Sequence, residues 1–261
     1  GVTIYGTGIQ IDPIKFDFID LLEKLNLLFE KEGKHVLLVF DEAQELRRLA
    51  KYRMDKLFAY IYDNFRNVRV VVTGSEIGLL YGFLKLNDAS SPLYGRAIGE
   101  INLERFDKVL TFKFLEKGYK QYGLTPPVDF IEYVFTRLDG IVGWLAYVGW
   151  ATKSVKSFKN ELVDELVKKA SKLAEEEFKR FLALHSQAEK RYELIMHAIA
   201  RVGEATWSEI KDFLALKGER MNDKNFTNLL NTLLKSSFIE KTHNKYKISD
   251  PVLQYSFEHS Y

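Results

Sequence analysis

The stretch HVLLVFDEAQEL, residues 35–46, places five consecutive apolar residues directly before two carboxylates. Val36 to Phe40 has the length of a β-strand and carries no polar side chain on either face, which is typical of a strand covered on both sides. Asp41 and Glu42 follow it at once. The sequence therefore predicts a buried strand that ends in a pair of acidic side chains.

A second stretch, VRVVVTGSE, repeats this design at residues 68–76. Its largely apolar run is followed by Thr73, Gly74 and Ser75, and a predicted helix connects it to the first strand. Two such strands joined by a helix indicate an α/β fold with a parallel sheet and helices on both faces. Ligands of such sheets bind at the carboxyl ends of the strands, where both polar stretches lie.

Glycine positions and helical spacing predict the remaining elements of the first 184 residues. Residues 1–12 have the pattern of a β-hairpin or of an irregular extended segment, and an amphipathic helix is expected to begin at Asp12-Pro13 and to end at Gly33. Residues 87–99 read as a loop. Helices are also expected at 54–65, 107–122, 128–138 and from Val142, a charged helical region at 151–184, and a short strand at INLERF, 101–106.

The last 75 residues, 187–261, have a pattern of their own. Three helices are expected, of which the second begins at Thr206 with Glu209 three residues later, the signature of a capping box. Two short β-like runs around His243-Asn244 follow. Three helices and a hairpin in this order predict a winged helix-turn-helix.

Composition excludes several classes of function. The chain has 261 residues, 38 Lys and Arg against 36 Asp and Glu, and no cysteine. Disulfides, thiolate metal sites and cysteine nucleophiles are therefore excluded, and a cytoplasmic location is expected. No apolar run reaches the length that spans a membrane. The five histidines show no spacing typical of a metal site.

The two carboxylates suit phosphoryl transfer. Asp41 is a candidate to hold Mg²⁺ through water, and Glu42 to polarise the attacking water. Ser75, with Thr73 as second choice, is a candidate to sense the γ-phosphate, and Arg96 in a glycine-flanked loop could act as an arginine finger. Simpler interpretations stay open, namely acidic and hydroxyl groups at helix N-termini and a surface arginine.

The predicted winged helix has candidates for contacts with DNA. Its residues 187–261 carry 11 Lys and Arg against 10 Asp and Glu, a net charge of +1, which is small for a module that neutralises phosphates. Winged helices also serve as protein-contact or lid elements, and DNA binding is therefore the less favoured interpretation. The candidates on the third helix and on the wing are Lys224, Asn225, Asn228, Lys241, Lys245 and Lys247.

A phosphate-binding loop of the form G-x-x-x-x-G-K-[ST] does not occur anywhere in the 261 residues. Such a loop supplies most of the binding energy for a nucleotide through its backbone amides and its lysine. We therefore expect this chain by itself to bind ATP poorly.

Five stretches in a fixed order resemble one known family. LLVFDEAQEL, VVVTGSEIGLLYGFL, SPLYGRAIGEINLERF, DGIVGWLAYVG and YKISDPVLQYSF are similar to the archaeal ATPases, P-loop proteins of the AAA+ and STAND kinds with a C-terminal winged helix. The resemblance covers nearly the whole chain. It implies binding of ATP and Mg²⁺, and an N-terminal segment with the Walker A loop, expected before Gly1.

The resemblance also implies roles for individual residues. Asp41 and Glu42 match the Walker B pair, Ser75 the sensor at the end of the next strand, and Arg96 the arginine of the third block. The block GIVGWL, with Gly143 and Trp144, matches an element that packs near the nucleotide in the family. Val142 stands where the family has a proline, so the geometry of this block can differ.

Together these observations predict a partial α/β ATPase core at 1–104, a helical lid at 105–186 and a winged helix at 187–261. The expected function is a nucleotide-driven switch that hydrolyses ATP and acts on an unidentified partner. The alternative is a winged-helix module that binds DNA or protein on an α/β scaffold without catalysis. A sheet without its first strand exposes a free edge, so dimerisation is also expected.

Overall fold

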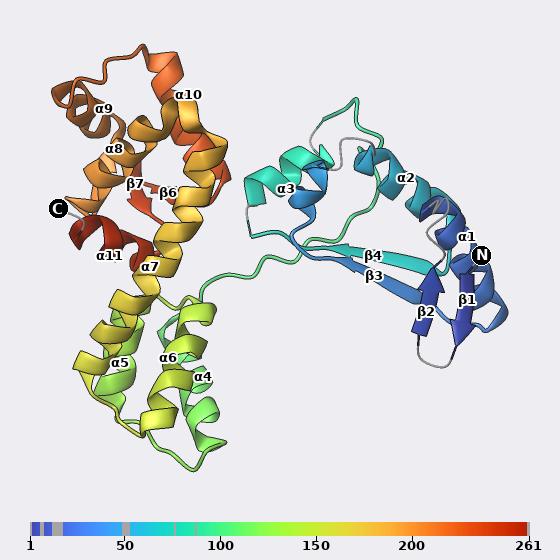
Figure 1. Ribbon diagram of the computed structural model, residues 1–261, viewed down its shortest axis with the longest axis horizontal. Helices are drawn as coiled ribbons and strands as arrows, with labels where there is room; N and C mark the ends of the chain where they lie inside the picture. Colours follow the sequence, from blue (N-terminus) through green and yellow to red (C-terminus); the bar gives the residue numbers. More distant parts are fainter. Residues whose placement is uncertain are drawn as a thin grey trace. The chain divides into compact units, whose positions relative to one another are not determined.

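The computed structural model describes residues 2–5, 8–11, 18–48, 53–75, 77–86 and 88–259. The chain forms two compact units, residues 1–98 and 99–261 (Figure 1). The expected start of the first helix at Asp12-Pro13 lies outside the described residues.

Unit 1 contains the predicted hairpin and the predicted parallel strands. β1 (Val2–Tyr5) pairs with β2 (Gly8–Ile11) in antiparallel orientation. β3 (Val36–Phe40) pairs with β4 (Val68–Val72) in parallel, and the register sets Val36 opposite Val68 and Phe40 opposite Val72. The two apolar stretches therefore end side by side, as the sequence predicts.

Two amphipathic helices cover one face of the β3–β4 pair. α1 (Phe18–Lys31) contacts β3 and α2 (Met54–Asn64) contacts β4. Leu22, Phe58 and Ile61 are almost fully buried in the core between these helices and the strands. Since residues of a strand alternate between its two faces, the even-numbered positions of both strands face this core.

The other face of the pair is open within the described residues. Leu37 and Val39 are 60% and 58% exposed, and Val71 is 44% exposed. The parallel α/β arrangement is confirmed, and among the described residues the helices of this unit cover one face of the pair. Arg69 shares the open face, which explains how a charged residue fits into an otherwise apolar strand.

Two short elements lie at the carboxyl ends of the strands. The 3-10 helix η1 (Ala43–Arg48) follows β3, and α3 (Ile77–Leu84) follows β4. They contact each other, so both polar stretches lead into one packed region. This region positions the candidate site.

Unit 2 contains the lid-like helices and the winged helix around one continuous core. α7 (Asn160–Leu184) packs against helices of both parts (Figure 1), because its apolar residues recur every three or four positions. The other helices are α4 (Lys108–Lys120), α5 (Val128–Leu138), α6 (Val142–Val155), η2 (Ser186–Ala188), α8 (Glu189–Ala200), α9 (Trp207–Leu216), α10 (Asp223–Lys235) and α11 (Pro251–His259).

The winged helix is confirmed and gains two elements that the sequence reading missed. β5 (Glu204–Thr206) joins the hairpin of β6 (Ile239–Thr242) and β7 (Lys245–Ile248) in the order β5-β7-β6. α11 follows the wing and packs against α7 and α8. The predicted capping box at Thr206 and Glu209 is present.

The short strand predicted at residues 101–106 is wrong. These residues pair with none of the described strands, and Ile101 and Leu103 are 87% and 93% exposed. Alternating apolar residues favour a strand only where a neighbour accepts the backbone hydrogen bonds. Here the segment is an extended connection into unit 2.

Across the described ranges, no helix is both long and apolar enough to cross a membrane.

The open sheet face gives a stability test. Leu22→Ala should lower the unfolding free energy of unit 1 by about 2–5 kcal/mol, because it empties a fully buried site. Leu37→Ala should cost less than about 1 kcal/mol, because the side chain is already largely solvated. Hydrogen exchange of peptides from residues 18–48 and 53–75 measures the loss of unfolding free energy in both variants. An equal loss for the two variants would mean that the second face is covered.

Candidate functional site

The backbone pairing of β3 and β4 continues past the ends of the strands. The Thr73 amide donates to the Phe40 carbonyl at 2.9 Å, and the Ala43 amide donates to the Thr73 carbonyl at 2.9 Å. These two bonds place Asp41 and Glu42 beside the residues that follow β4. The proximity predicted from the parallel arrangement is therefore present.

Thr73 connects the two acidic residues. Its hydroxyl donates to Asp41 Oδ1 at 2.5 Å and accepts from the Glu42 backbone amide at 3.2 Å. The Asp41 carboxylate is exposed, with a hydroxyl holding one of its oxygens. Thr73 therefore orients Asp41 without removing it from solvent.

Glu42 is held by Ser75 and by Gln44. The Ser75 amide and hydroxyl both donate to Glu42 Oε2 at 3.1 Å, and Gln44 Nε2 donates to the same oxygen at 2.5 Å. The Glu42 backbone has φ of +47°, a conformation that residues with a side chain rarely adopt. Three donors on one oxygen thus fix this carboxylate.

The oxygen ligands at this edge suit Mg²⁺. A Mg²⁺ ion in nucleotide enzymes is bound by one or two carboxylates, with waters and phosphate oxygens completing the octahedron. Asp41, exposed and oriented by Thr73, can supply one such carboxylate. In the part of the chain that is described, no group of three or more His, Asp or Glu side chains could hold a metal by itself.

Gln44 is the site residue that the sequence reading missed. It lies two positions after Glu42 in the quoted stretch and is 1% exposed. No pattern in the sequence marks it, because Glu42, Glu45 and Arg47 make this stretch polar on both sides of Gln44. Its burial depends on the packing of η1 and is seen only in the structure.

Arg96 lies elsewhere in unit 1. Its Nε and Nη2 donate to the two oxygens of Asp63 at 3.0 and 2.6 Å, which lowers the pKa of the Asp63 carboxyl. Asp63 is next to the last residue of α2, which leads into the amino end of β4. The structure therefore places Arg96 near the amino ends of the strands, whereas Asp41 and Glu42 lie at their carboxyl ends.

Trp144 lies in unit 2, at the start of α6, with Gly143 exposed beside it. Trp144 Nε1 donates to Asp250 Oδ2 at 2.9 Å, and the Val252 amide donates to Asp250 Oδ1 at 2.7 Å. Burial raises the pKa of Asp250, against the effect of these hydrogen bonds. Trp144 thus joins the lid helices to the start of α11.

Arg105 forms a second connection within unit 2. Its guanidinium donates to Asp139, to Glu240 Oε2 at 3.3 Å and to the Ser249 carbonyl at 2.5 Å. These residues come from the end of α5, the wing and the turn before α11. Arg105, Asp139 and Ser249 belong to three of the five blocks that carry the family resemblance. These three blocks therefore meet at the Arg105 guanidinium.

Gly140 allows the chain to pass closely at this junction. Its φ is +69°, and a Cβ atom there would lie 1.8 Å from the Phe106 carbonyl oxygen. The Phe106 amide also donates to the Gly140 carbonyl at 2.9 Å. No other residue fits this position without moving the backbone.

The residues proposed for DNA contact divide into two groups. Lys224, Asn225 and Asn228 on α10 are exposed, as are Lys241 and Lys245 on the wing. Lys247 is half-buried and forms an ion pair with Glu240 at 2.7 Å. The wing therefore presents two of its three predicted lysines to solvent.

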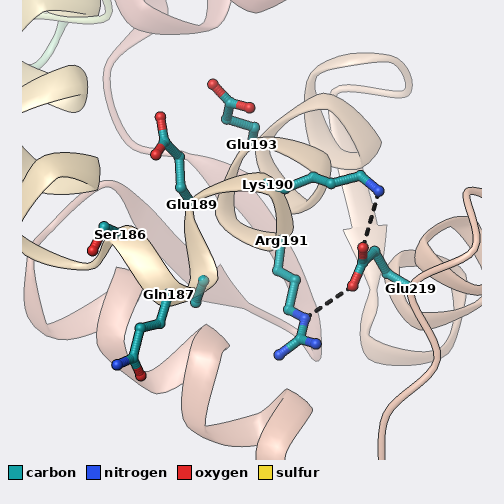
Figure 2. Close-up of a pocket in the computed structure, with 8 residues that line it drawn as sticks. Ser186, Gln187, Glu189, Lys190, Arg191, Glu193 and Glu219 are labelled. Carbon is teal, nitrogen blue, oxygen red and sulfur yellow. Dashed lines mark hydrogen bonds and ion pairs between the residues drawn. The ribbon is translucent and has the colours of Figure 1, made fainter.

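A polar pocket of about 350 Å³ lies in the winged helix (Figure 2). It is lined by the start of α8 and by Glu219, which forms ion pairs with Lys190 and Arg191 at 3.0 Å each. Both of its cations are paired with Glu219, which leaves Glu189 and Glu193 as further carboxylates in the lining, and it holds none of the residues predicted to act in chemistry. It is not part of the candidate site.

Comparisons with known proteins found two matching families and a similar solved structure. Residues 7–148 match the family described as the ATPase domain predominantly from Archaea, and residues 186–249 match the C-terminal winged helix-turn-helix domain of MCM proteins. A solved structure, the Walker-type ATPase PABY2304 of Pyrococcus abyssi, is 36% identical with a TM-score of 0.84. The similarity covers 95% of this chain and 69% of that chain. No curated protein matches.

The junction around Arg105 gives the second prediction. Arg105→Ala should lower the stability of unit 2 by about 1 kcal/mol, because it removes hydrogen bonds of a partly exposed guanidinium. Hydrogen exchange at residues 239–249 should become faster than elsewhere in the unit. Arg201→Ala, an exposed arginine of the same unit, is the control and should change neither quantity. Unchanged exchange in the Arg105 variant would contradict the proposed connection.

Proposed function

This chain belongs to the family of ATPase domains found predominantly in Archaea, and on that premise we propose that Asp41 and Glu42 are the acidic pair of its ATP-hydrolysis site. In this proposal Asp41 holds Mg²⁺ through water, and Glu42 orients the water that attacks the γ-phosphate. The observation that carries the proposal is the hydrogen bonding of both carboxylates to Thr73 and Ser75 at the carboxyl end of the parallel pair.

Bound Mg²⁺ would neutralise charge on the phosphates as the terminal bond breaks. The residues of this chain would contribute by holding the two carboxylates in the orientations that catalysis requires. Thr73 keeps Asp41 turned toward solvent, where a hydrated ion can reach it. Ser75 holds Glu42 and lies at the end of the neighbouring strand, so its hydroxyl is our candidate to respond to the γ-phosphate.

The phosphate groups also need a cradle of backbone amides and a lysine. Since the 261 residues contain no G-x-x-x-x-G-K-[ST] motif, we propose that polypeptide outside them supplies this loop. The complete site would then lie where that loop meets Asp41 and Thr73.

Arg96 and Trp144 are not part of the hydrolysis site in this proposal. Arg96 is bound to Asp63, so we do not include it in the hydrolysis site of its own chain, and its role as an arginine finger stays a prediction. Trp144 is bound to Asp250, so we propose that it transmits movement between the lid helices and the winged helix. A nucleotide-driven switch would use this rigid unit 2 as its moving part.

Contact of the winged helix with duplex DNA is a second candidate function. It is favoured by the exposed Lys224, Asn225 and Asn228 on α10 and by two exposed lysines on the wing. The net charge of +1 over residues 187–261 limits its strength.

Substitution of the carboxylates tests the hydrolysis site. In a polypeptide that joins this chain to the proposed phosphate-binding loop, Glu42→Gln should lower kcat by about 100-fold or more and leave ATP binding intact, because only water activation is lost. Asp41→Asn should weaken Mg²⁺-dependent nucleotide binding. Steady-state hydrolysis and calorimetry measure both effects. A Glu42→Gln protein that hydrolyses ATP at the normal rate would refute the proposed role.

The 261-residue chain alone provides the companion measurement. Calorimetry with Mg-ATP should detect no micromolar binding, because the motif that carries most of the phosphate contacts is not in its sequence. Micromolar binding would show that other residues of this chain form the cradle.

Salt dependence tests the DNA candidate. Neutralisation of about three phosphates by Lys224, Lys241 and Lys245 gives a slope of about −3 for log K against log salt concentration. A gel shift should show about 60-fold weaker binding at 200 mM than at 50 mM salt, and replacement of all three lysines by alanine should flatten the slope. Binding that does not change with salt would remove DNA as a partner.

A further inference from the structure

Gln44 is a buried side chain with only part of its hydrogen-bonding capacity in use. It is 1% exposed, and its Nε2 donates to Glu42 Oε2 at 2.5 Å. Its Oε1 is buried and, among the described residues, has no hydrogen-bond partner. A buried amide with an unpaired carbonyl oxygen reduces stability, so the folding of η1 alone does not explain a glutamine at this position.

Gly74 provides the space that Gln44 occupies. A Cβ atom at Gly74 would lie 2.6 Å from Gln44 Oε1 and 3.1 Å from Leu80 Cδ2. Gly74 is not among the described glycines with positive φ. A glycine is therefore needed here for the close approach of the Gln44 amide and not for its backbone conformation.

Glu42 is the residue that this packing controls. Its Oε2 receives Gln44 from η1 and Ser75 from the end of β4, so the carboxylate is fixed from two sides. The φ of +47° at Glu42 costs free energy, and hydrogen bonds to its side chain help to maintain it. Without Gln44, the two donors of Ser75 would hold the carboxylate from one side, and the side chain could rotate about that residue.

We propose that Gln44, seated against Gly74, is a positioning residue that fixes the Glu42 carboxylate for water activation. The inference rests on the proposed function of Glu42. A positioning residue of this kind does not contact the nucleotide or the attacking water. Gln44 acts only by setting the orientation of Glu42.

A merely structural role for Gln44 predicts a different result from a positioning role. Methionine has nearly the volume of glutamine and no carbonyl to leave unpaired. If Gln44 only fills space, Gln44→Met should leave the rate of hydrolysis unchanged. If Gln44 positions Glu42, the same variant should keep or raise Tm and yet hydrolyse ATP slowly.

The kinetic test uses a polypeptide that joins this chain to the proposed phosphate-binding loop. Gln44→Met should lower kcat by about 10- to 100-fold with KM for ATP within about twofold of normal, because orientation and not binding is lost. The matched control is Gln254→Met, which breaks another Gln–Glu hydrogen bond, to Glu258 at 2.7 Å in α11. The control should keep normal kcat. Normal kcat in Gln44→Met would overturn the inference.

Two further comparisons separate this inference from the proposed function. If Glu42→Gln leaves hydrolysis unchanged, the proposed function fails; if Glu42→Gln abolishes it and Gln44→Met does not affect it, only the inference fails. The double variant Gln44→Met/Glu42→Gln should be no slower than Glu42→Gln alone, because both changes act on one group. A further loss in the double variant would contradict action through Glu42.

A measurement without nucleotide uses the 261-residue chain. The side-chain amide protons of Gln44 should exchange slowly by NMR and become faster in Glu42→Ala, whereas Asp41→Asn should leave them unchanged. Gly74→Ala should displace the Gln44 amide and speed its exchange in the same way. Fast exchange in the unaltered chain, or no response to Glu42→Ala, would overturn the inference.

Discussion

The parallel register of β3 and β4 is the constraint on which the candidate site depends. Phe40 stands opposite Val72, so both strands end at the same level, and two further backbone hydrogen bonds carry the pairing to Ala43. A shift of the register by one residue would turn Thr73 and Ser75 to the other face. The contacts of Asp41 and Glu42 therefore follow from the pairing of ten strand residues, most of which have no polar group.

The site contains two acidic side chains that are held differently. Asp41 is exposed and oriented by one hydroxyl, which suits a ligand of a hydrated cation. Glu42 is held by donors from both strand ends, which suits a group that must keep one orientation toward water. This division of environment agrees with the division of roles that hydrolysis of a phosphate bond requires.

Unit 2 combines the lid helices and the winged helix around a single core. Arg105, Trp144 and Asp250 join elements that are more than 100 residues apart in the sequence. Because α7 packs against both parts, the helices α5 and α6 and the winged helix share one core. The three-part division expected from the sequence, with boundaries at residues 104 and 186, stays a prediction beside the two units that the structure forms.

The sequence by itself determined the strands, most helices and the family, because apolar periodicity, caps and ordered motifs are local properties. It also placed Asp41, Glu42, Thr73 and Ser75 at one edge, since parallel strands share their carboxyl ends. Only the tertiary structure decided the rest. A strand at residues 101–106 needs a neighbour to accept its hydrogen bonds, the orientation of Arg96 depends on the distant Asp63, and the burial of Gln44 depends on its approach to Gly74. Such contacts between residues far apart leave no periodic signal in a single sequence.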